Sequence, residues 1–146
     1  MGIQQSPEAT NPTIASGGPS PAEMEAAPLN REVGTRLLFE NTTVRVWEVR
    51  LEPGDRAPLH CHALDYFWTC TEPGTALQWQ LKASTWEQHG RSYAVGDTQY
   101  FTRGNDAPVI HDLHNNGDTT LRFVTVELLG RTERHTSSST TPGATP

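Results

Sequence analysis

The sequence has little cysteine and no long apolar run. Its two cysteines, Cys61 and Cys70, are too few for a disulfide framework and do not form a CxxC pair, so we expect two reduced thiols. No apolar stretch approaches the roughly 20 residues of a membrane span, and the N-terminus lacks the basic start and apolar centre of a secretory signal. These absences predict a cytoplasmic chain that does not contact a membrane.

Positive charge is also scarce. The 146 residues carry 17 acidic and 11 basic side chains, for a formal net charge of −6, and the basic residues form no run. Such a chain would be repelled by polyanions, so we expect no nucleic acid and no anionic membrane surface among its partners.

Composition divides the chain into two tails and one body. Residues 1–30 hold five of the eleven prolines among mostly Ala, Ser, Gly, Gln and Glu, and residues 131–146 are again rich in Ser, Thr, Gly and Pro. Segments like these cannot bury enough apolar surface to offset their ordering entropy, so both are predicted to be disordered, including the one helix-like stretch at 21–27. Residues 31–130 remain as a single domain of about 100 residues with one core.

Within this body the apolar residues recur with a period of two. Short β-favouring runs occur at 44–51, 64–68, 77–81 and 121–126, and this spacing is typical of strands. Glycine-containing turn signals separate them, at 52–55, 72–75, 89–92, 95–98, 103–106 and 115–118. Short strands joined by such turns predict an all-β sandwich or barrel.

Two of the six histidines are spaced for a strand. His60 and His62 lie two residues apart in PLHCHAL, so both imidazoles would leave one face of a strand and could share a cation. An isolated pair of this kind is equally consistent with two polar residues on a solvent-facing strand. A third ligand from elsewhere would favour the metal.

The surrounding residues resemble the conserved motifs of the cupin superfamily. Gly54, five residues, His60, one residue and His62 match the first motif. In the second, Gly96 is followed after five residues by Thr102, Arg103 and Gly104, then by six residues rather than the usual two, and then by His111 and, after three more, Asn115. The flanking segments LFENTTVRVWEVRLEPGD and HNNGDTTLRFVTVELL are also similar to small bacterial cupins, so the resemblance covers nearly all of residues 37–129.

The resemblance implies a single-domain cupin-type jelly-roll β-barrel with a metal bound by His60, His62 and His111. Alternation along the later strand would then turn Leu113 and Asn115 inward with His111, and turn His114 outward. The longer loop before His111 need not move it, because strand pairing follows alternation rather than loop length.

The chain departs from the first motif where the family has a glutamate. That position falls on Tyr66 or Phe67, neither of which is a carboxylate. The resemblance is then to the neutral three-histidine sites of cupin dioxygenases that act on thiols, diketones and gentisate. Tyr66 is a candidate catalytic residue, as an acid, a base or a hydrogen-bond donor to substrate. It is equally well interpreted as an aromatic that lines the barrel.

From this site we expect a divalent metal cofactor, with Fe²⁺ as the leading candidate and Zn²⁺, Ni²⁺ or Mn²⁺ also compatible with the ligands. The expected function is that of a metal-dependent oxygenase acting on a small-molecule substrate. The alternatives are a non-catalytic cupin that binds a small ligand or metal, and an isomerase, cyclase or lyase that uses the metal as a Lewis acid.

Three further expectations concern the surroundings of the site. Each ligand histidine is expected to donate its second ring N–H to an acceptor, for which Glu48, Asp65, Gln80 and Asp112 are the candidates. Some of the cavity walls are expected from Tyr66, Trp68, Trp79, Tyr100 and Phe101. A homodimer is implied by the resemblance, with a weak hint in the apolar positions on both faces of 44–51.

Overall fold

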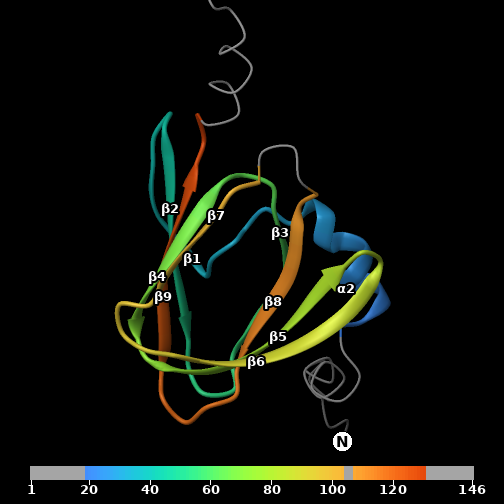
Figure 1. The fold of residues 1–146 in the computed structure, drawn as a ribbon, viewed down its shortest axis with the longest axis vertical. Coiled ribbons are helices and arrows are strands. Elements are labelled where there is room, and N and C mark those ends of the chain that lie inside the picture. Colours follow the sequence, from blue (N-terminus) through green and yellow to red (C-terminus); the bar gives the residue numbers. More distant parts are fainter. Residues whose placement is uncertain (1–18, 104–106, 131–146) are drawn as a thin grey trace, which may run out of the picture.

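Two antiparallel sheets face each other across a common interior (Figure 1). The computed structural model describes residues 19–103 and 107–130. One sheet has the strand order β1-β2-β9-β4-β7 and the other β3-β8-β5-β6. The strands are β1 (Arg36–Glu40), β2 (Val44–Leu51), β3 (Arg56–His62), β4 (Tyr66–Glu72), β5 (Gly74–Lys82), β6 (Thr85–Tyr93), β7 (Thr98–Phe101), β8 (Val109–Asn115) and β9 (Leu121–Leu128). The all-β prediction is confirmed.

A short helical segment precedes the sheets. Helix α2 (Pro21–Ala26) begins at the N-cap Ser20, whose hydroxyl accepts from the backbone N–H of Glu23, and leads into the 3₁₀ turn η1 (Ala27–Leu29). The prediction that residues 1–30 form only a tail is therefore wrong for residues 19–30. Residues 1–18 and 131–146 lie outside the described part of the chain.

The helical segment is held to β3 mainly by polar contacts, and Ala27 is its one buried apolar residue. The Glu23 carboxylate accepts from the backbone N–H of Leu59 at 2.9 Å and from the Arg56 guanidinium. Asn30 donates its side-chain amide to the Leu59 carbonyl at 3.0 Å and accepts at its own carbonyl from the N–H of Cys61 at 2.8 Å. Because β3 is an edge strand of its sheet, these bonds satisfy backbone groups that would otherwise face water.

The hydrophobic core lies between the sheets. Its buried members come mainly from the inward positions of β2 and β9, joined by residues of β3, β4 and β5: Val49, Leu51, Ala57, Cys70, Ala76, Leu121 and Phe123. Strict alternation of buried and half-buried residues along β9 is the pattern of a strand with one face on a core. Among the described residues no helix is long and apolar enough to cross a bilayer.

Several connections agree with the predicted turns and one does not. Gly54 and Gly96 have φ of +87° and +90°, a backbone conformation open to glycine but costly for other residues. The signal at 89–92 is wrong, because those residues are paired with β5 inside β6. The hairpin instead turns at Ala83 and Ser84, both with positive φ. Neither residue type signals such a turn.

Candidate metal centre

Three histidines converge between the sheets, two from β3 and one from β8. His60 lies directly opposite His111 in the register of the two strands, and His62 follows on the same face as His60. His60 and His62 are buried and His111 is half-buried. The predicted inward direction of His111 is thus seen, despite the longer loop before it.

The imidazole nitrogens are close enough to bind one ion. The Nε2 atom of His62 lies 3.1 Å from Nε2 of His60 and 3.0 Å from Nε2 of His111. Two nitrogens bound at right angles to one ion at about 2.1 Å would lie about 3.0 Å apart. Among the described residues, this trio is the one group of three or more possible ligands within such reach, and no carboxylate or thiol joins it.

Protons alone cannot satisfy these contacts. His60 Nδ1 donates to the Pro58 carbonyl at 2.8 Å, which in the neutral ring leaves Nε2 as an acceptor. His62 Nε2 carries at most one proton, so it cannot make separate directed hydrogen bonds to both neighbours. A divalent ion would accept a lone pair from each ring, and the residues present therefore fit such an ion.

Burial keeps the three rings in their ligand form. Desolvation lowers the pKa of His60 to about 4, against a smaller opposing effect of the hydrogen bond to Pro58. Burial also lowers the pKa values of His62 and His111 well below the ordinary histidine value, and the neighbouring imidazoles lower them further. At neutral pH the rings are neutral, as metal binding requires.

The two motifs are joined by hydrogen bonds at the far ends of these strands. The buried Asn115 donates its side-chain amide to the carbonyls of Leu51 and Thr119, both at 2.8 Å. Its backbone carbonyl accepts from Gly54 N–H at 2.9 Å. Asn115 thus ties the β2–β3 turn to the β8–β9 turn and sets the position of β3 relative to β8.

Tyr66 lies against the site through its ring face. It stacks on His62 with ring centroids 3.9 Å apart and planes 11° from parallel, and Phe101 stacks on its other side at 4.7 Å. Burial raises the pKa of the Tyr66 phenol above its ordinary value, so the hydroxyl keeps its proton at neutral pH. The catalytic role of Tyr66 stays a prediction.

The expected side-chain acceptors for the histidines are engaged elsewhere. Asp112 faces the outer side of the sheet, where it accepts from Arg56 at 2.7 Å and from the backbone N–H of Trp79 at 2.6 Å. Glu48 pairs with two arginines, and Asp65 accepts from the backbone N–H of Arg103. The acceptor for His60 is a backbone carbonyl, while the Nδ1 atoms of His62 and His111 have no partner within residues 19–103 and 107–130.

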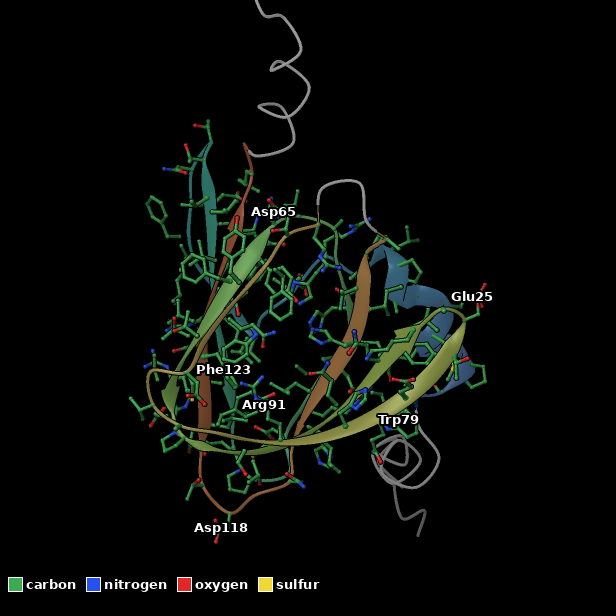
Figure 2. The ribbon with its side chains drawn as sticks, in the orientation of Figure 1. Glu25, Asp65, Trp79, Arg91, Asp118 and Phe123 are labelled. Carbon is green, nitrogen blue, oxygen red and sulfur yellow. The ribbon has the colours of Figure 1, made fainter. Side chains whose placement is uncertain are left out.

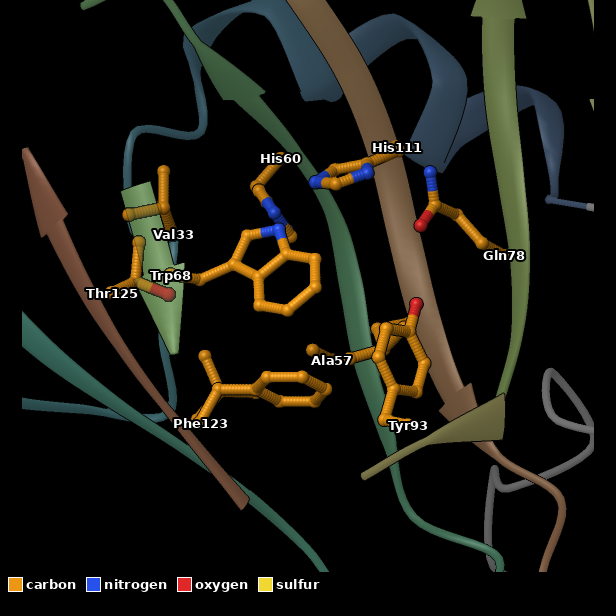
Figure 3. A pocket seen from close by; sticks show the side chains of 11 residues that line it. Val33, Ala57, His60, Trp68, Gln78, Tyr93, His111, Phe123 and Thr125 are labelled. Atoms are coloured by element: carbon orange, nitrogen blue, oxygen red, sulfur yellow. The ribbon is translucent and has the colours of Figure 1, made fainter. Parts of the chain in front are cut away.

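A small inner cavity of about 50 Å³ adjoins the histidines (Figure 3). His60 and His111 form one part of its wall, and aromatic rings face them from the other sheet. The full lining is Val33, Val49, Ala57, His60, Trp68, Gln78, Tyr93, His111, Leu113, Phe123 and Thr125. Trp68 is a wall as predicted. Trp79 and Tyr100 are not, because both occupy outward positions on their strands.

Polar residues line an adjoining outer cavity of about 230 Å³, and of these only Gln80 had been predicted to lie near the site. Gln78 and Gln80 point inward from β5, Arg91 from β6 and Gln99 from β7. The apolar alternation of 77–81 suggested the opposite orientation of β5. The available signal was the pair of glutamines that alternate with Leu77, Trp79 and Leu81. With the apolar residues on the outer face of β5, these glutamines point into the barrel.

Comparison with known proteins shows a shared fold. No protein-family model and no curated protein matches the chain. Among solved structures, a cupin domain from Bordetella pertussis is 24% identical, with a TM-score of 0.52, covering 64% of this chain and 88% of its own. A protein from Bacillus halodurans is 18% identical, with a TM-score of 0.50, covering 77% and 83%. The chain therefore has the cupin fold.

Proposed function

We propose that this protein is a metal-dependent enzyme acting on a small organic molecule, with oxygenation as its reaction and Fe²⁺ as its metal. The observation that carries the proposal is the convergence of three neutral imidazole nitrogens, two of the contacts being 3.0 and 3.1 Å. A bound Fe²⁺ would supply reactivity toward dioxygen and a Lewis acid for the substrate. His60, His62 and His111 are the residues that would hold it.

The remaining residues of the site bind and orient. Three neutral ligands leave the double charge of a divalent ion uncompensated, which favours an anionic or chelating substrate. Tyr66, held between His62 and Phe101, restricts the orientation of the His62 ring. Trp68 and Phe123 give the inner cavity an apolar wall for the carbon skeleton of a small substrate.

A second candidate function is supported by the size of the inner cavity. A volume of about 50 Å³ holds little more than a water or two or a very small group. This favours either a small substrate or a cupin that binds a metal or ligand without turnover. Lewis-acid isomerisation or lyase chemistry would use the same ligands.

Oxygen consumption by the iron-loaded protein separates these functions. Purified protein is loaded with Fe²⁺ in the absence of oxygen. It is then mixed with air-saturated solutions of diketones, catechols or thiols. We expect oxygen uptake with one of these classes, and none from the His111→Ala variant. Stoichiometric iron with no uptake on any class would instead identify a binding protein or a Lewis-acid enzyme.

A further inference from the structure

The outer cavity carries one permanent positive charge that no carboxylate neutralises. The Arg91 guanidinium lies 5.2 Å from the ring centroid of Trp68 and 4.9 Å from that of Tyr93, and its Nη1 donates to Gln99 Oε1 at 3.1 Å. Five other arginines, Arg36, Arg45, Arg50, Arg56 and Arg122, pair with acidic side chains. Within residues 19–103 and 107–130, Arg91 has no ion-pair partner.

The inward placement of polar residues is unusual for a sheet face. On β5 the glutamines point into the barrel, while the apolar side chains between them, such as Trp79, point outward (Figure 2). A strand that merely completed a core would have the opposite orientation, because inward polar groups need hydrogen-bond partners. Gln78 donates to Gln80 Oε1 at 3.3 Å, so these amides make one long bond with each other and keep further donors and acceptors for a ligand.

The outer cavity is continuous in its walls with the inner one. Trp68, Gln78 and Tyr93 line both. Figure 3 shows the Gln78 amide beside the His111 ring and Tyr93 below it. Arg91 precedes Tyr93 by two residues and lies on the same face of β6. A molecule in the outer cavity therefore contacts residues that also line the inner cavity beside His60 and His111.

We infer that the substrate is a small carboxylic acid, bound by Arg91 in the outer cavity while its other end extends toward the histidines. This inference rests on the proposed function. A planar guanidinium matches a carboxylate with two parallel hydrogen bonds, and Trp68 and Tyr93 hold its plane through cation–π contact. One positive charge suits a carboxylate better than a doubly charged phosphate ester, and the second end of the acid would face the uncompensated charge of the metal.

Calorimetry with dicarboxylates and with an uncharged diamide of similar size tests this inference. Protein loaded with Zn²⁺, which is redox-inert, is titrated with malonate, succinate and glutarate, and with succinamide, which has the size of succinate without its charge. We expect at least one dicarboxylate to bind and succinamide to bind at least about tenfold more weakly. Arg91→Gln should lower the affinity for that acid by about tenfold to a hundredfold, the range expected for charge-assisted hydrogen bonds.

Matched variants separate recognition from folding. Arg50→Gln removes an exposed arginine that pairs with Glu52, and we expect unchanged affinity. Arg91→Lys keeps the charge without the planar fork and should bind with intermediate affinity, which a merely structural role would not produce. Metal content and circular dichroism are measured on the same samples.

Three results would overturn the inference: equal binding of the acid by Arg91→Gln and the wild type, binding of succinamide as tight as that of the acid, or no binding of any of the acids at millimolar concentration. Failure of the wild type to hold metal would instead contradict the proposed function. The effect of Arg91→Gln on acid binding would then be judged on metal-free protein.

Discussion

At the residue scale, the convergence of the three histidines could be anticipated, because strand alternation places His60 and His62 on one face and the resemblance to the second cupin motif points to His111. Their neighbours could not be predicted the same way. Asp112 lies next to His111 in the sequence but on the opposite face of β8, where it accepts from Arg56, whose guanidinium also donates to Glu23 of helix α2. The acceptor for His60 is the carbonyl of Pro58. Every residue has a backbone carbonyl, so the residue types in the sequence do not indicate which one accepts.

Glu48 gives a pH-dependent prediction at this scale. Its carboxylate accepts from Arg122 Nε at 2.7 Å and from Arg36 Nε at 3.2 Å. These bonds, the one from Arg122 first, hold the pKa of Glu48 below its ordinary value of 4.5. A carboxyl whose pKa is lower in the folded than in the unfolded state stabilises the folded protein at pH values above its unfolded-state pKa. This contribution is lost as the pH falls through the folded-state pKa.

We therefore expect Glu48→Gln to cost on the order of 1 to 3 kcal/mol in free energy of unfolding near neutral pH. The cost should shrink as pH falls below 4.5. Urea unfolding across this range measures both. Glu87→Gln, which removes an exposed partner of Lys82, is the control and should change stability by less than about 1 kcal/mol at any pH. A cost for Glu48→Gln that does not depend on pH would contradict the account.

At the element scale, strands with regular alternation and most glycine-containing turns were predictable, the signal at 89–92 being the exception, whereas two features were hidden. Helix α2 sits in a proline-rich segment without an apolar face, and it is held by hydrogen bonds to β3 that composition does not reveal. The β5–β6 hairpin turns at Ala83 and Ser84, with φ of 46° and 72°. A left-handed backbone conformation at such residues costs roughly 1 to 2 kcal/mol each. The position of this turn is therefore determined by the extensive pairing of β5 with β6 rather than by local preference.

Replacing Ala83 and Ser84 by Asn and Gly should therefore stabilise the protein. Asn-Gly is the preferred pair for a two-residue turn with positive φ at both positions, and we expect a gain of about 1 kcal/mol in free energy of unfolding. Denaturant titration measures it. Ala83→Val is the opposite control, because a β-branched residue is strained at this φ and should destabilise. A double variant no more stable than the wild type would show that the turn is not strained.

At the scale of the whole molecule, the fold class and the single core were predictable. The weak sequence hint of a dimer interface lay in β2 and stays a prediction, and in the described part of the chain three consecutive exposed apolar side chains lie on the neighbouring edge strand β1. Leu37, Leu38 and Phe39 are 46%, 42% and 53% exposed. In an antiparallel pair of two β1 strands centred on Leu38, Arg36 of each copy would lie opposite Glu40 of the other, so the strand is complementary to itself.

We predict a homodimer in solution formed through β1. Light scattering coupled to size-exclusion chromatography should give twice the mass of the chain for the wild type, and the mass of one chain for Phe39→Glu. Leu29→Glu introduces the same charge at a more exposed apolar residue, 85% exposed on η1, and should remain dimeric. A monomeric wild type, or a dimeric Phe39→Glu variant, would contradict this prediction.

The central claim is that His60, His62 and His111 form one metal site, and elemental analysis of matched variants tests it most directly. His114 lies on the same strand as His111 but at an outward position, so His114→Ala removes an imidazole without touching the site. The account predicts about one equivalent of divalent metal in the wild type and in His114→Ala, and loss of that metal from each of His60→Ala, His62→Ala and His111→Ala. Full retention of metal by His111→Ala would contradict it.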